Sequence, residues 1–271
     1  NLSSTQISKL TTDQLAAVTS DKVASLFIGT ISALKTDQLS SLTTAQVQGF
    51  TSTQIVAMTT AQIRSLTSDQ LASISTGVIS TLKGSQIAAL TSDQFKNLTS
   101  AQINNLSSSQ IANIATAVIS SLTSNQIVAL STSNIVGFTT AQLSKLTSDQ
   151  LQSLETVDFG RLTSVQLRTL TSDQIGALTL DIVKSISTTQ LKSLTSQQVS
   201  KLSSDQIGAL TSSQIASFDQ KQISYLTTEQ IASLSSSALG NLSNVQIGML
   251  TTGQIKALTS SQLDSLTSAQ V

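Results

Sequence analysis

The sequence of 271 residues contains no proline, cysteine, histidine or tryptophan, only one tyrosine, and only 10% charged residues. Without cysteine the chain has neither disulfides nor thiolate metal sites, although this leaves its compartment open. Without histidine it lacks the commonest general base and the commonest metal ligand. The usual means of building a catalytic or metal centre are therefore missing.

Charge and long apolar runs are also scarce. Fourteen basic residues balance fourteen acidic ones, so we expect neither a nucleic-acid partner nor attraction to an anionic membrane. No apolar run is long enough to cross a bilayer, which predicts no membrane insertion. Because the sequence has no starting methionine and no signal peptide, we expect a piece of a longer chain. A hydrophobic content of 39% argues against disorder.

The residues that are present form an eight-residue repeat. Stepping by eight from Leu2 gives 34 places that are all large and apolar, and stepping by eight from Ile7 gives another 34. No insertion or deletion breaks the register. The repeat unit is Leu-Thr-Ser-x-Gln-Ile-x-x, and residues 1–271 are predicted to form a single array of about 34 octads.

The spacing within the octad favours a short helix that restarts in every unit. The apolar places are separated by five and then three residues, which defeats the alternation of a strand, and on one continuous helix the pattern drifts by about 80° per octad. In "TSDQ", Thr171 to Gln174, the spacing is that of a capping box. Leu170 and Ile175 have the spacing of a hydrophobic staple across the same helix start.

The charges are sorted along the octad in the same sense. Acids at the fourth place fall in the first helical turn, and bases at the last two places fall in the final turn, as the helix dipole favours. A β-solenoid, the alternative fold, gives no reason for this sorting. The acids are Asp13, Asp21, Asp37, Asp69, Asp93, Asp149, Asp173, Asp181, Asp205 and Glu229, and the bases are Lys9, Arg64, Lys96, Lys145, Arg161, Arg168, Lys184, Lys192, Lys201 and Lys256.

Helices of about six residues do not persist alone in water, so stability must come from neighbouring units that share a core. The predicted fold is therefore all-α: a solenoid of very short helices, one per octad, with leucine and isoleucine inside. The number of units per superhelical turn does not follow from the sequence.

Eight octads lack the fifth-place glutamine, and two interpretations stay open. In the first interpretation, the fifth place contacts a neighbouring turn and tolerates apolar side chains. In the second, the spacing of 40 residues between Val78, Val118 and Asp158 indicates a superhelical repeat of about five units. The eight residues are Lys22, Thr30, Val78, Val118, Asn134, Asp158, Ile182 and Ala238.

No residue is predicted to be catalytic, to bind a cofactor or to hold a metal. Serine and threonine are abundant, but a nucleophile needs a positioned base, and the lysines lie at predicted helix ends. The acids recur one per octad, and no calcium-loop pattern or phosphate loop is present. We therefore expect neither an enzyme nor a small-molecule substrate.

The units "LTTAQV", "LTSDQI" and "LTTEQI" resemble repeat tracts of very long bacterial surface and secreted proteins described as adhesin-like or haem-utilisation-like. The resemblance covers the whole chain and implies a secreted or surface-displayed array that serves as a spacer, stalk or fibre. Since histidine is absent, the axial ligands left for haem would be Met58, Met249 or Tyr225, and no cofactor is predicted.

The leading functional hypothesis is a structural scaffold in a bacterial surface adhesin or an extracellular filament, able to associate end to end or laterally. A second hypothesis is a regular Ser/Thr face that binds ice, water or polysaccharide. A third is a protein-interaction solenoid, which predicts a patch of variable aromatic or charged residues in adjacent octads. Adjacent octads contain no such patch.

Overall fold

The computed structural model describes residues 2–271, and these contain 33 α-helices of four to six residues and no strand. The all-α solenoid of very short helices is confirmed, and the β-solenoid alternative is wrong. The chain divides into a first unit that ends at Lys145 and a second unit that begins at Leu146. Each unit is described by itself.

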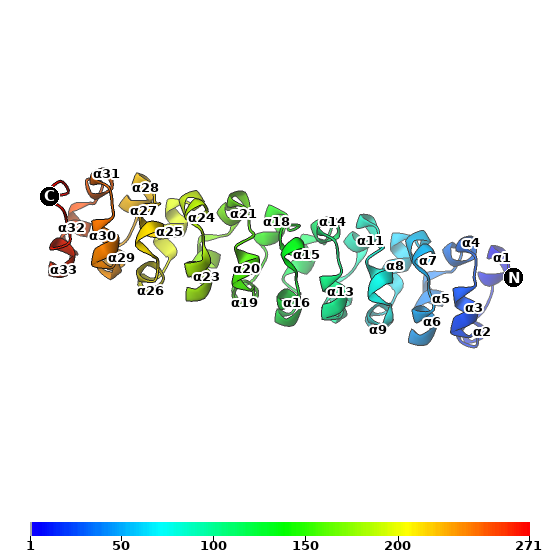
Figure 1. Cartoon of the computed structure of the whole chain (residues 1–271). Coiled ribbons are helices and arrows are strands. Elements are labelled where there is room, and N and C mark those ends of the chain that lie inside the picture. The colour runs from blue at the N-terminus through cyan, green and yellow to red at the C-terminus, as the bar shows by residue number, and fades with distance from the viewer. Residues whose placement is uncertain (1) are drawn as a thin grey trace. The chain divides into compact units, whose positions relative to one another are not determined.

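The first unit consists of eighteen helices, one in each successive octad (Figure 1). They are α1 (Ser4–Ile7), α2 (Thr12–Ala16), α3 (Ser20–Ala24), α4 (Ile28–Ser32), α5 (Thr36–Ser40), α6 (Thr44–Gln48), α7 (Ser52–Ala57), α8 (Thr60–Ser65), α9 (Ser68–Ser73), α10 (Thr76–Ile79), α11 (Gly84–Ala89), α12 (Ser92–Asn97), α13 (Ser100–Asn104), α14 (Ser108–Ala112), α15 (Thr116–Ile119), α16 (Ser124–Val128), α17 (Thr132–Ile135) and α18 (Thr140–Leu143).

The second unit continues the same pattern with fifteen helices. They are α19 (Ser148–Gln152), α20 (Thr156–Phe159), α21 (Ser164–Thr169), α22 (Ser172–Gly176), α23 (Leu180–Ser185), α24 (Thr188–Ser193), α25 (Ser196–Lys201), α26 (Ser204–Gly208), α27 (Ser212–Ala216), α28 (Gln220–Ser224), α29 (Thr228–Ser233), α30 (Ser236–Gly240), α31 (Asn244–Ile247), α32 (Thr252–Lys256) and α33 (Ser260–Leu263).

Most helices begin with the predicted capping box. At α9 the Thr67 hydroxyl accepts a hydrogen bond from the Gln70 backbone N–H at 3.2 Å, and Gln70 Oε1 accepts one from the Thr67 N–H at 2.7 Å. These two bonds satisfy N–H groups that have no partner within a helix. Where Lys35 occupies the cap position, its backbone N–H still donates to Gln38 Oε1 at 2.9 Å, so the glutamine half of the box persists.

The helices end without proline or a left-handed residue. No described residue has a positive φ. Between α8 and α9 the chain is extended at two residues, Leu66 (φ −60°, ψ 138°) and Thr67 (φ −68°, ψ 160°). A threonine that caps the next helix is therefore enough to end the previous one. The threonine side-chain oxygen accepts a backbone hydrogen bond and so competes with the bonds of a continuous helix.

One acid at a helix start, Glu229, has a lowered pKa. Glu229 lies in the first turn of α29. Hydrogen bonds from its own backbone N–H and from the side chains of Thr227 and Thr228 lower the pKa of its carboxyl. At this octad the start of the helix therefore stabilises the ionised carboxylate.

The core of each unit is built from the two apolar series. Leu71 and Ile87, which come from the sixth place of the octad, are 0% exposed, and Leu66 and Ile74, from the first place, are 2% and 3% exposed. Burying each such side chain stabilises the fold by about 1.5–3 kcal/mol. Since a single octad supplies only two of them, a helix needs neighbours from other turns.

Those neighbours lie three helices away. In the first unit α6 packs on α3 and α9, and in the second unit α26 packs on α29 (Figure 1). In the second unit α22 likewise packs on α25. Hydrogen bonds between turns span 25 residues in some cases and 28 to 31 in others. One turn of the solenoid is therefore longer than three octads and shorter than four, and the interpretation of a five-unit turn is wrong.

Candidate functional site

The fifth-place glutamine joins two turns of the solenoid. In α13, Gln102 Oε1 accepts from the Thr99 N–H at 2.8 Å, while Gln102 Nε2 donates to the carbonyl oxygens of Leu71 at 3.1 Å, Ala72 at 3.2 Å and Ile74 at 2.7 Å. The side chain is 1% exposed. One amide therefore bonds to the start of its own helix and to the end of a helix one turn earlier.

We call this arrangement the glutamine bridge. The last carbonyls of a helix have no partner inside it, and a buried carbonyl left without one costs about 1–3 kcal/mol. Such bridges recur along both units, and every fully buried side-chain nitrogen or oxygen of residues 2–271 has a hydrogen-bond partner. Buried glutamines that donate to an earlier turn include Gln38, Gln46, Gln54, Gln62, Gln70, Gln86, Gln94, Gln110, Gln126, Gln142, Gln190, Gln198, Gln206, Gln214, Gln222, Gln230, Gln246, Gln254 and Gln262.

Most octads that lack this glutamine still bury the side chain at the fifth place, although Lys22 is exposed and Val78 is half-buried. Val118, Ile182 and Ala238 are 4%, 2% and 1% exposed, and Asn134 still donates from Nδ2 to the Leu106 carbonyl. The interpretation that the fifth place contacts a neighbouring turn and tolerates apolar side chains is therefore confirmed. Asp158 is the acidic case.

Asp158 lies at the fifth place of its octad in α20 and is 4% exposed. Burial raises the pKa of its carboxyl, and the nearby charge of Glu155 raises it further. Both effects disfavour the ionised form. An ionised Asp158 therefore destabilises the folded state, which a neutral glutamine at this place would not do.

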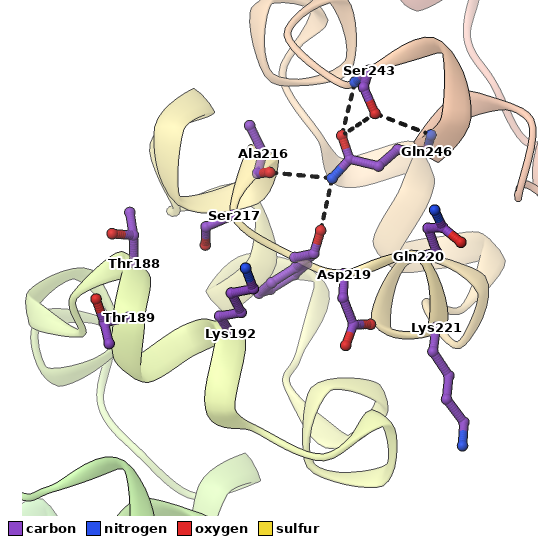
Figure 2. Close-up of a pocket in the computed structure, with 11 residues that line it drawn as sticks. Thr188, Thr189, Lys192, Ala216, Ser217, Asp219, Gln220, Lys221, Ser243 and Gln246 are labelled. Atoms are coloured by element: carbon purple, nitrogen blue, oxygen red, sulfur yellow. Dashed lines mark hydrogen bonds between the residues drawn. The ribbon is translucent and has the colours of Figure 1, made fainter.

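The second unit also contains a solvent-open groove, which is a candidate binding site. It has a volume of about 660 Å³ and lies between α24, α27, α28 and α31. In Figure 2, Thr188, Thr189 and Lys192 lie on one side, and Asp219, Gln220 and Lys221 lie on the other. Its residues are Thr188, Thr189, Lys192, Ala216, Ser217, Phe218, Asp219, Gln220, Lys221, Ser243 and Gln246.

A second hollow of about 400 Å³ shares Lys192, Asp219 and Lys221 with this groove. We call the two hollows together the basic groove. The second hollow is lined by Arg168, Lys192, Ser193, Leu194, Thr195, Ser196, Gln197, Asp219, Lys221, Gln222 and Tyr225.

The groove carries an excess of positive charge. Arg168, Lys192 and Lys221 face a single acid, Asp219. Asp219 is the N-cap of α28, and its Oδ1 accepts from the Gln222 N–H at 2.7 Å. Residues 2–271 contain one ion pair, between Lys201 Nζ and Asp173 Oδ1 at 3.3 Å. The three cations of the groove are therefore not engaged in ion pairs.

The edge of the groove presents Tyr225, the only tyrosine of the chain, with 49% of its surface exposed. Arg168, Lys192 and Lys221 come from α21, α24 and α28, and successive members are separated by 24 and 29 residues. Charged and aromatic side chains thus form a patch whose members come from three octads that are not adjacent in sequence. Adjacent octads contain none because spatial neighbours are about one turn apart in sequence.

The sequence predicted no catalytic, cofactor-binding or metal-binding residue. The three possible axial ligands are divided between the units: Met58 is buried in the first at 4% exposure, whereas Met249 and Tyr225 are exposed in the second. In the described part of the chain, no three acidic side chains are grouped so that they would hold a metal ion. Residues 2–271 likewise contain no helix that is long and apolar enough to span a membrane.

The fold and the bridge define the class of molecule as an α-solenoid repeat protein. The model of the ALTTAQ repeat matches four stretches of the chain, residues 30–60, 119–156, 151–185 and 183–212. These matches confirm that the chain is a repeat protein. It matches none of the curated proteins with which it was compared.

Proposed function

We propose that the chain is a structural scaffold that serves as a spacer or stalk in a bacterial surface adhesin or an extracellular filament. The observation that carries the proposal is the glutamine bridge. The same bridge recurs from turn to turn in each unit, so the structure is specified by local and next-turn contacts alone. Such an array adds length without needing a new core.

The extracellular location is supported by the resemblance of "LTTAQV" and "LTTEQI" to repeat tracts of bacterial surface proteins. Immunogold electron microscopy of the native cells, with an antibody against this chain, tests the location. We expect label outside the envelope and loss of label after protease treatment of intact cells. Label confined to the cytoplasm would contradict the proposal.

The spacer role is tested separately by small-angle X-ray scattering of the chain. A compact globule of 271 residues has a radius of gyration of about 19 Å. A spacer should give a value well above this, whereas a value close to the globular one would refute the role. Lateral or end-to-end self-association is a further prediction, and sedimentation velocity over a range of concentrations tests it.

A further inference from the structure

We propose that the basic groove of the second unit binds a linear acidic polysaccharide, one whose sugar units carry carboxylate or sulfate groups. The proposal goes beyond the scaffold role and does not depend on it. It assigns the anionic groups of the ligand to Arg168, Lys192 and Lys221, and a sugar ring to the exposed face of Tyr225.

Charge complementarity is the first argument. The groove is lined by three cations and one acid, in a chain whose formal net charge is zero. Arg168 and Lys192 are exposed and outside any ion pair of residues 2–271. A guanidinium binds a carboxylate or sulfate through two parallel hydrogen bonds, and such charge-assisted bonds are about twice as strong as neutral ones.

The remaining surface of the groove suits a hydroxylated ligand. The exposed side chains of Thr188 and Thr189 line the larger hollow, and a hydroxyl both donates and accepts. The hydroxyls of Ser217 and Ser243 in the same hollow already donate to Gln214 and Gln246. Tyr225 adds an amphipathic ring whose apolar face covers a sugar ring while its hydroxyl stays solvated. Because the groove is open to solvent and shallow, an extended strand fits it better than an enclosed small molecule.

Nucleic acid is the competing polyanion, and the groove suits it less well. Nucleic-acid sites usually combine a basic stripe with several stacking aromatic rings. Here the groove offers three cations and one exposed ring. The cations come one from each of α21, α24 and α28 and are not clustered on a single helix, which suits a ligand whose charges are separated by neutral groups.

The test measures binding of the whole chain to immobilised ligands by biolayer interferometry at low ionic strength. The probes are heparin for sulfate groups, polygalacturonate for carboxylate groups, neutral dextran and single-stranded poly(dT). We expect at least one acidic polysaccharide to bind more tightly than dextran and poly(dT), with affinity that falls as salt rises. The relative affinity for heparin and polygalacturonate identifies the anionic group.

Matched variants locate the site. The double variant Lys192→Gln/Lys221→Gln should lose affinity by about tenfold or more, since two charge-assisted contacts are removed. The control Lys184→Gln/Lys256→Gln changes charge equally at residues that do not line the groove and should bind like the parent chain. Tyr225→Phe should retain binding and Tyr225→Ser should weaken it.

Three results would overturn the proposal. They are no binding to either acidic polysaccharide, equal loss in the groove and control variants, or tighter binding to poly(dT) than to both polysaccharides. All substituted side chains are exposed, so circular dichroism should show unchanged helix content in each variant. A failure of this proposal would leave the scaffold role intact, because the scattering and surface-labelling experiments do not involve the groove.

Discussion

Replacing one bridging glutamine should destabilise the solenoid more than replacing a glutamine that only caps its own helix. In Gln102→Leu, the bond from the Thr99 N–H and the bonds to Leu71, Ala72 and Ile74 are lost. Because the two protons of Nε2 are shared among the three carbonyls, the loss corresponds to about three full hydrogen bonds. At about 1 kcal/mol for each neutral hydrogen bond, the loss amounts to about 3 kcal/mol. The leucine side chain returns part of this through apolar burial, so the expected net cost is about 2 kcal/mol.

The matched control is Gln14→Leu. Gln14 is exposed and makes the capping box with Thr11, so its replacement should cost only about 0.5–1 kcal/mol. Urea unfolding followed by far-ultraviolet circular dichroism gives both values, provided that the slopes of the transitions agree. If Gln102→Leu costs no more than Gln14→Leu, the bonds between turns do not stabilise the fold.

A second substitution, Gln102→Glu, distinguishes the effect of lost hydrogen bonds from the effect of a changed side-chain shape. Gln102→Glu retains the acceptor for Thr99 but places a carboxylate against the carbonyls of Leu71 and Ile74. The folded state should raise the pKa of this glutamate, so the native state binds the proton more tightly than the unfolded chain does. Stability should then fall as pH rises through the raised pKa, and Gln102→Leu should lack this dependence.

The other predictions concern single positions. The raised pKa of Asp158 means that stability falls as pH rises from below 3.8 through the folded value, so Asp158→Asn should stabilise the protein at neutral pH and flatten this fall in urea titrations. Gly176→Ala should destabilise by about 1–3 kcal/mol, because a Cβ there would lie 2.7 Å from the Lys201 carbonyl oxygen. Gly77→Ala should instead stabilise by about 0.5–1 kcal/mol, since no atom lies within 4 Å of the Cβ that would be added. Equal melting temperatures of Gly176→Ala and Gly77→Ala would contradict this difference in packing. In Ala238→Gln, the new glutamine can form a glutamine bridge at a helix start that Ser235 already caps, so this variant should be more stable by about 1 kcal/mol. A lowered melting temperature would show that the larger side chain does not fit.

The helical nature of the octad was predictable because it rests on local chemistry. The cap at Thr171, the glutamine at Gln174 and the staple of Leu170 with Ile175 all act within one octad. The structure places Thr171 Oγ1 3.1 Å from the Gln174 nitrogen that donates to it and buries both apolar residues. Nothing beyond eight residues is needed to specify this helix start.

The length of one solenoid turn was not predictable from the chemistry of a single octad. The number of octads per turn depends on how side chains from different turns fit together, and an octad pattern is the same for any number of units. The bonds that Gln102 Nε2 donates to an earlier turn were also not predictable from the octad, because a capping box uses only the Oε1 atom of the glutamine side chain. Val118, Ile182 and Ala238 were the available clue, because three apolar side chains at the place of a polar one indicate that this place is buried.

The basic groove was missed for the same reason. Arg168, Lys192 and Lys221 are far apart in sequence and become neighbours only when the turn length is known. A search of the sequence at separations of 24 to 29 residues, rather than in adjacent octads, would have connected the three cations, and Tyr225 follows Lys221 by four residues.

The central claim is that each buried glutamine amide bonds to the preceding turn, and nuclear magnetic resonance of glutamine-labelled protein tests it most directly. Nuclear Overhauser effects from the side-chain NH₂ of Gln102 should reach residues 71 to 75, which lie 27 to 31 positions earlier. Effects confined to its own octad and the adjacent ones, or directed to residues about 40 positions away, would contradict the account.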